Sequence, residues 1–152
     1  MEVWLFLHLL GFTLWLGGGF ASMVAGIAAR REDRQGLGAV VRAQAALQRT
    51  IVAPGALLTV LSGLILTFSV TGRTGDLVGF SFWLVLMQGA GVLGALVTLL
   101  VGLPTATRLA RLDPAGGHAA FFDELRQRQR VVGSIAGVLA LVALVAGAWY
   151  RY

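Results

Sequence analysis

The chain alternates between long stretches without a charged residue and short segments rich in arginine. The uncharged stretches predict four membrane-spanning helices, at about residues 3–29, 50–72, 79–107 and 131–150, because roughly 20 mostly apolar residues are needed to cross a bilayer. The pattern indicates an all-α protein, an integral membrane four-helix bundle that forms a single transmembrane domain over residues 1–152.

Apolar positions also indicate where the second and fourth helices begin. Leu37, Val40 and Val41 follow helical spacing ahead of the second span, and Phe121 and Phe122 precede the fourth. Both helices should therefore start before they enter the membrane.

The two halves of the chain resemble each other weakly. Residues 47–49 read Leu-Gln-Arg at the entrance to the second span, and residues 128–130 read Arg-Gln-Arg at the entrance to the fourth. Such an echo favours two tandem helical hairpins with the same orientation.

Composition supports a membrane protein and excludes several kinds of chemistry. The chain is 57% hydrophobic and 12% charged, with a mean hydropathy of +0.82, which is far too apolar for an ordinary soluble domain. It has no cysteine, so disulfides, thiolate metal sites and iron–sulfur clusters are excluded. All 12 basic residues are arginine, so no lysine is present to form a Schiff base.

The distribution of arginine predicts the topology. Two connections carry five arginines each, and these are Arg30, Arg31, Arg34, Arg42 and Arg49 in the first and Arg108, Arg111, Arg126, Arg128 and Arg130 in the second. The middle connection has Arg73 alone. The positive-inside rule then places both termini on the non-cytoplasmic side of the inner membrane. We expect the net charge of +5 to face lipid headgroups and not nucleic acid.

The first span contains an ionisable residue, His8. An imidazole at this depth is costly unless it has a partner or a ligand. Trp4, Gly11, Phe12 and Trp15 share its helix face by their spacing. This face is the main functional clue in the chain.

Two interpretations of His8 remain open. In the first, His8 ligates haem b or, less well, copper, with Met87 or Gln88 of the third span at a similar depth. Gly11 would leave room for a flat macrocycle, beside Trp15, and Arg73 at the outer rim would pair with propionates. In the second, His8 is neutral and hydrogen-bonded to a neighbouring carbonyl or hydroxyl, without any cofactor.

Met87 and Gln88 also have simpler interpretations. Methionine fills gaps in any apolar core, so Met87 alone favours packing. A buried amide needs a partner, and a hydrogen bond from Gln88 to another helix would provide one.

The segment from His8 to Gly18, HLLGFTLWLGG, resembles the opening helix of the CopD-like copper-resistance membrane proteins and of related small four-helix families. The membrane protoporphyrinogen oxidase family has a similar histidine-bearing first helix. The resemblance implies a membrane bundle with a haem or copper site at His8. The oxidase family relies on a lysine, which this chain lacks, so we do not expect an enzyme and assign no catalytic residue.

Two functions follow as hypotheses. The first is a small haem-binding membrane protein with an electron-transfer or cofactor-handling role. The alternative is a cofactor-free accessory or scaffold subunit of a larger membrane complex, since small residues recur at four-residue spacing in the spans and allow close helix packing. Both are compatible with a homo-oligomer.

Overall fold

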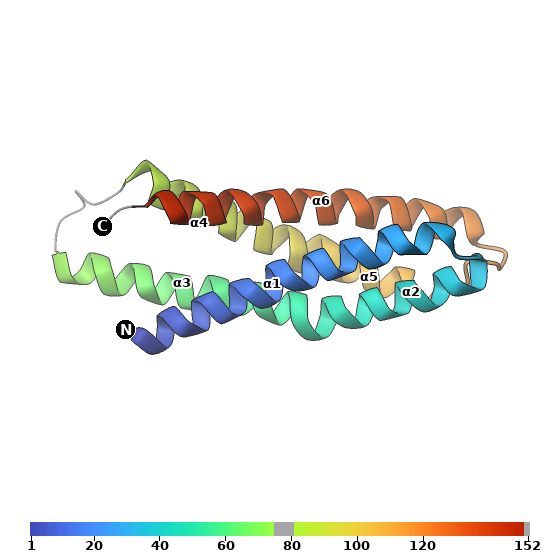
Figure 1. Ribbon diagram of the computed structural model, residues 1–152, viewed down its shortest axis with the longest axis horizontal. Coiled ribbons are helices and arrows are strands. Elements are labelled where there is room, and N and C mark those ends of the chain that lie inside the picture. Colours follow the sequence, from blue (N-terminus) through green and yellow to red (C-terminus); the bar gives the residue numbers. More distant parts are fainter. Residues whose placement is uncertain (75–80, 151–152) are drawn as a thin grey trace.

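A computed structural model of the chain describes the backbone of residues 1–74 and 81–150 and the side chains of residues 1–69 and 81–150. Throughout these residues the regular structure is helical, as expected (Figure 1). In chain order the elements are α1 (Glu2–Ala28), η1 (Ala29–Arg31), α2 (Arg34–Leu47), η2 (Gln48–Val52), α3 (Ala53–Thr74), α4 (Phe82–Leu96), η4 (Val97–Gly102), α5 (Leu103–Leu109) and α6 (Ala119–Trp149).

These elements join into long helices that suit a membrane. Within the described residues four helices are long and apolar enough to cross it, Glu2–Arg31, Arg34–Ser69, Phe82–Leu109 and Ala119–Trp149. The protein is therefore a multi-pass, all-α membrane bundle. The second and fourth helices begin at Arg34 and Ala119, well before the uncharged stretches, as the apolar positions predicted.

Two of the helices contain a π-helical turn beside a proline. The turn η2 ends at Val52 and precedes Pro54, and η4 ends at Gly102 and precedes Pro104. Proline has no N–H to donate and its ring crowds the preceding turn, so a wider turn relieves the clash. Both helices continue without a break through these positions.

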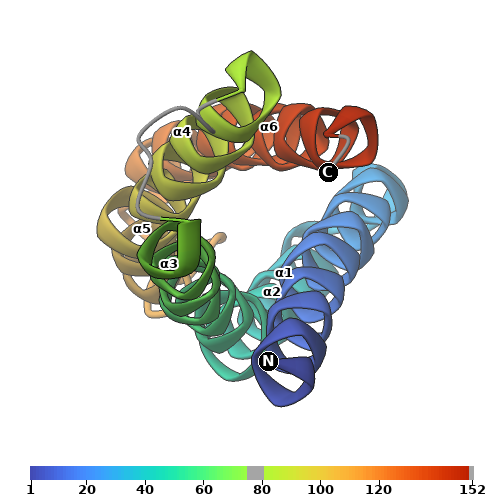
Figure 2. The same ribbon diagram turned by 90° about the vertical axis from the view of Figure 1, so that its left-hand side faces the viewer.

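The bundle consists of two helical hairpins. Helix α1 packs mainly against α3, and α4 packs mainly against α6, while the contacts between the two pairs are fewer. Figure 1 shows the two hairpin connections at one end and both termini at the other. The end-on view in Figure 2 shows that α1 lies apart from α6 near the N-terminus. We call the end with the two hairpin connections the arginine-rich end.

Two clusters of buried side chains form separate cores. The central core lies in the middle of the bundle and contains Trp15, Val52, Ala56, Ala95 and Ala140. The end core lies near the arginine-rich end and contains Val41, Leu109, Phe122 and Leu125.

A salt bridge also joins the hairpins at the arginine-rich end. The Arg34 guanidinium donates to both carboxylate oxygens of Asp123, at 3.0 and 2.9 Å. The hairpins are thus connected at this end by apolar packing and by an ion pair.

Candidate functional site

The ring of His8 lies against α3 and is half-buried. Its Nδ1 atom is 2.9 Å from the backbone carbonyl oxygen of Thr59 and 3.3 Å from the Ser62 hydroxyl. The Ser62 hydroxyl donates its proton to the carbonyl of Leu58. A carbonyl oxygen only accepts, so Nδ1 must carry the imidazole proton.

This hydrogen bond determines which tautomer the neutral imidazole adopts. With the proton on Nδ1, the neutral ring presents Nε2 as an unprotonated acceptor. Among the described side chains, the hydrogen bonds of His8 involve Nδ1 and none involves Nε2. An Nδ1–H bonded to a carbonyl is also the arrangement typical of histidines whose other nitrogen binds a metal.

Gly63 brings α3 close to this ring. A Cβ atom added at Gly63 would lie 3.0 Å from Cε1 and 3.2 Å from Nδ1 of His8. A side chain at position 63 would therefore push the imidazole away from the Thr59 carbonyl.

Gly11 has a different role from the one expected. A Cβ at Gly11 would lie 2.8 Å from the Thr59 amide nitrogen and 2.9 Å from the Gly55 carbonyl oxygen. The backbone of α3 thus fills the space over Gly11, and the room expected there for a flat macrocycle does not exist. Gly11 and Gly55 instead let α1 and α3 touch backbone to backbone.

Trp15 connects the two hairpins. Its indole Nε1–H donates to the Thr98 hydroxyl at 3.2 Å, and its six-membered ring lies over Gly94, where an added Cβ would be 3.1 Å away. The side chain is only 3% exposed. Trp15 therefore belongs to the central core and does not flank a ligand beside His8.

The other expected site residues do not assemble around His8. The Met87 sulfur lies against Gly147 of α6, where an added Cβ would be 3.0 Å away. The Gln88 amide donates to the Thr67 hydroxyl at 2.7 Å, which is the helix-to-helix hydrogen bond considered from the sequence. The side chain of Arg73 lies outside the described residues. The expected convergence of His8 with Met87 or Gln88 is thus replaced by separate partners for each.

Sequence reasoning missed a large cavity between the hairpins. It has a volume of about 530 Å³ and is lined by residues of α1, α2, η2, η4, α5 and α6. Trp15 and Val52 of the central core line it, and so do Val41 and Leu109 of the end core. The cavity is therefore the space that the two cores leave between them.

Polar side chains gather in this cavity. Its lining includes three arginines and three glutamines, namely Arg30, Arg126, Arg130, Gln44, Gln48 and Gln129. The Nη2 atom of Arg126 and the Oε1 atom of Gln129 are buried, and neither has a hydrogen-bond partner among the described residues. Both π-helical turns contribute as well, through Gln48 and Gly102, and such turns are frequent at functional sites.

A signal for this cavity was present in the sequence. Arg126, Gln129, Gly133 and Gly137 follow helical spacing on one face of the fourth helix. This face combines polar groups with glycines, which is unusual beside a membrane. Its significance depends on what stands opposite, and the sequence alone does not give the rotation of neighbouring helices.

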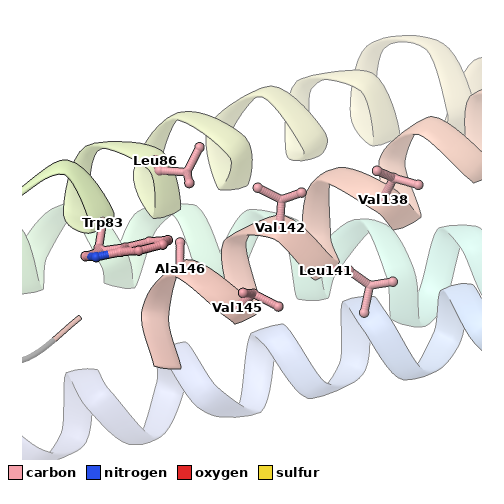
Figure 3. Close-up of a pocket in the computed structure, with 7 residues that line it drawn as sticks. All are labelled: Trp83, Leu86, Val138, Leu141, Val142, Val145 and Ala146. Carbon is pink, nitrogen blue, oxygen red and sulfur yellow. The ribbon is translucent and has the colours of Figure 1, made fainter. Parts of the chain in front are cut away.

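A smaller apolar pocket lies between α4 and α6. Its volume is about 260 Å³, and Figure 3 shows Trp83 and Leu86 of α4 facing five residues of α6. Val138 and Leu141 line both this pocket and the larger cavity, so the two adjoin along α6. The Trp83 ring stacks on Trp149, with 6.1 Å between the ring centroids.

Metal-binding side chains do not cluster in the described part of the chain. No group of three or more His, Cys, Asp or Glu residues gathers there in a way that could hold a metal ion. A metal at His8 would therefore need most of its ligands from a cofactor or from another molecule.

Comparisons with known proteins give no relative. No protein-family model matches the chain, and neither a curated protein nor a solved structure matches it.

Proposed function

We propose that this protein is a small membrane protein of the inner membrane that binds haem b through Nε2 of His8 and serves in electron transfer or cofactor handling. One observation supports the proposal above all. The Nδ1 atom of His8 lies 2.9 Å from the Thr59 carbonyl oxygen, which fixes the ring and, in the neutral imidazole, places the free lone pair on Nε2.

Haem suits this donor set better than copper does. The porphyrin supplies four nitrogens to the iron, so one imidazole is a sufficient protein ligand. Copper needs two or three protein donors of the histidine, methionine or cysteine type. The described residues place none of these beside His8, because the Met87 sulfur lies against Gly147.

The residues around His8 would orient the ligand bond. The Thr59 carbonyl holds the Nδ1 proton and fixes the tautomer and orientation of the ring, and Gly63 gives the ring its close approach to α3. Bound haem would supply one-electron chemistry. Gly11 is covered by α3 and would therefore not contribute to the haem site, whereas a second His8 from another copy would be a suitable further protein ligand.

The test is a reduced-minus-oxidised absorption spectrum of the protein purified in detergent and supplemented with haem. Wild type should give a b-type spectrum with about one haem per one or two chains. His8→Ala should lose it, and His118→Ala should retain it, because His118 is exposed in the α5–α6 connection. Equal spectra in the two variants would reject ligation by His8.

A second variant probes the orientation of the ring without removing the ligand. In Gly63→Ala the new methyl group stands 3.0 Å from Cε1 of His8, so the ring must turn away from Thr59. We expect weaker haem retention and a shifted spectrum. An unchanged spectrum would show that the hydrogen bond to Thr59 has no role in binding.

The proposed topology places both termini on the non-cytoplasmic side, because five arginines occur in each of the two connections opposite them. The chain has no cysteine, so an introduced cysteine is the single thiol that a maleimide can label. An impermeant maleimide should label Arg73→Cys in intact cells and should fail to label Gln35→Cys. The reverse pattern would invert the protein in the membrane.

A second candidate function is that of an accessory subunit. A Cβ added at Gly17, Gly89 or Gly91 would meet nothing within 4 Å, so these glycines present small surfaces outward, where a helix of a partner protein could pack. Native mass spectrometry after mild extraction should then show the chain with a second protein. Recovery of the chain alone, or as a homo-oligomer only, would reject this function.

A further inference from the structure

We propose that the cavity between the two hairpins binds one phospholipid with an anionic headgroup that also carries a hydroxyl group, as phosphatidylglycerol does. The headgroup occupies the polar end, between Arg126 and Gln129, and an acyl chain follows α6 away from the arginine-rich end. The proposal concerns different residues from the haem proposal and does not depend on it.

The charges near the cavity are strongly unbalanced. The charged groups that act on Arg126 are Arg30, Arg34 and Arg130, against the single carboxylate of Asp123. That carboxylate is already bound by Arg34 through two hydrogen bonds. Among the described residues Arg126 therefore lies near more cationic than anionic groups, and a phosphate would supply a counterion.

Two buried groups also need partners. Leaving a buried donor or acceptor without a hydrogen bond costs about 1–3 kcal/mol, yet the described residues offer no partner to Nη2 of Arg126 or to Oε1 of Gln129. A phosphate oxygen would accept from Arg126. A hydroxyl of the headgroup would donate to Gln129, because the phosphodiester itself has no proton to donate.

The chain keeps this space open with glycines. A Cβ added at Gly19, Gly133 or Gly137 would meet nothing within 4 Å, and all three glycines line the cavity. The volume of about 530 Å³ lies within the usual range for ligand sites. A bundle without a ligand here would gain contacts by closing this space.

The cavity has a side open to lipid and a path for an acyl chain. Its lining residues Met23 and Ile27 of α1 and Val138 of α6 are 54%, 52% and 60% exposed, so it opens between these two helices. Val138 and Leu141 continue into the apolar pocket beside Trp83, shown in Figure 3. A lipid could thus enter sideways, with its headgroup among polar residues and its chain among apolar ones.

Native mass spectrometry of the full-length, delipidated protein tests the proposal. Phosphatidylglycerol, phosphatidylcholine and inorganic phosphate are titrated separately in neutral detergent. We expect one phosphatidylglycerol per chain to bind with higher affinity than phosphatidylcholine, and excess inorganic phosphate to leave it in place. Arg126→Gln should weaken binding at least about tenfold, since it removes a charge-assisted hydrogen bond.

Matched variants separate the cavity from general surface charge. Arg128→Gln removes an exposed arginine of the same helix that does not line the cavity, so binding should persist. Gly133→Leu fills the cavity without altering any charge and should abolish binding. Gly89→Leu places the same side chain at an open glycine outside the cavity and should have no effect. Melting temperatures without lipid establish that each variant is folded.

Three results would overturn the proposal. Equal affinity for phosphatidylglycerol and phosphatidylcholine would show that the headgroup charge does not contribute to binding. An equal loss of phosphatidylglycerol affinity in Arg126→Gln and Arg128→Gln would indicate binding to a diffuse basic surface. Displacement by inorganic phosphate, with normal binding in Gly133→Leu, would identify a site for a free anion.

Discussion

The contact between α1 and α3 and the space between the two hairpins are opposite solutions to helix packing. In the first, Gly11 and Gly55 bring two backbones together, and the half-buried imidazole of His8 has a hydrogen-bond partner. In the second, about 530 Å³ stays unfilled and the polar atoms of Arg126 and Gln129 have no partner among the described residues.

The difference indicates which helix interface is fully packed and hydrogen-bonded by residues of the chain itself. Helices in lipid associate through packing and hydrogen bonds, because the hydrophobic effect does not favour helix–helix contact over contact with lipid. The α1–α3 contact uses both and is complete. The inter-hairpin space uses neither fully, so it is the part of the bundle that a further molecule can stabilise.

The largest expected effect is at the residue that crosses between the two regions. Trp15→Ala should lower the free energy of unfolding by about 3–5 kcal/mol, because it empties a large buried site and enlarges the adjoining cavity. Trp15→Phe should cost far less, since it keeps most of the ring packing and loses the hydrogen bond to Thr98. Thermal melting in detergent measures both. Similar losses in the two variants would mean that the hydrogen bond, and not the packing, joins the hairpins.

A methyl group at matched glycines compares the regions directly. In Gly55→Ala the new carbon would lie 2.7 Å from the Trp15 amide nitrogen, so the helices must separate, at a cost of about 1–3 kcal/mol. In Gly133→Ala it meets nothing within 4 Å, and stability should be unchanged or slightly higher. Melting curves of the two variants give the comparison. Equal destabilisation would show that the inter-hairpin space is closed in solution.

The smallest effect concerns two glutamines. Gln88→Leu removes the bond to Thr67 and should cost about 0.6 kcal/mol, the average for intramembrane hydrogen bonds. Gln129→Leu removes an acceptor that has no partner, so in delipidated protein it should cost nothing or stabilise the fold. Chemical unfolding measures whether each substitution raises or lowers the free energy of unfolding. A larger loss for Gln129→Leu would mean that Gln129 is already satisfied without lipid.

The helices could be predicted well from the sequence. Uncharged stretches predicted the four spans, and Leu37 and Phe122 indicated that the second and fourth helices begin early. Both side chains are buried in the structure, Phe122 in the end core. The need of Gln88 for a partner on another helix also followed from the cost of burying an amide.

The assembly of the site could not be predicted in the same way. Similar depth in the membrane predicted that His8 meets Met87 or Gln88, but depth leaves the rotation of each helix undetermined. Rotation directs Met87 to α6 and Gln88 to α3. The covering of Gly11 by α3 has the same origin, since a bare glycine suits a ligand and a neighbouring backbone equally well.

The cavity was missed because Arg126 was assigned to an arginine-rich connection and Gln129 to the entrance of the fourth span. They lie instead beside the space between the two cores. Short polar sequences at helix ends carry this ambiguity generally, because their surroundings come from a different part of the chain.

The π-helical turn η4 has a consequence for the length of the chain. A π turn holds about one residue more than an α turn, so Val97–Gly102 stores one residue without rotating the helix that follows. Deleting Leu100, which is 69% exposed, should let the segment close into α-helix while Thr105 and Leu109 keep their buried directions, at the cost of returning the Pro104 ring to its clash with the preceding turn. The same deletion two turns earlier, at Val92 in regular α-helix, should turn the following residues by about 100° and expose them. We therefore expect the chain to tolerate a change of length at η4 that it would not tolerate in α4.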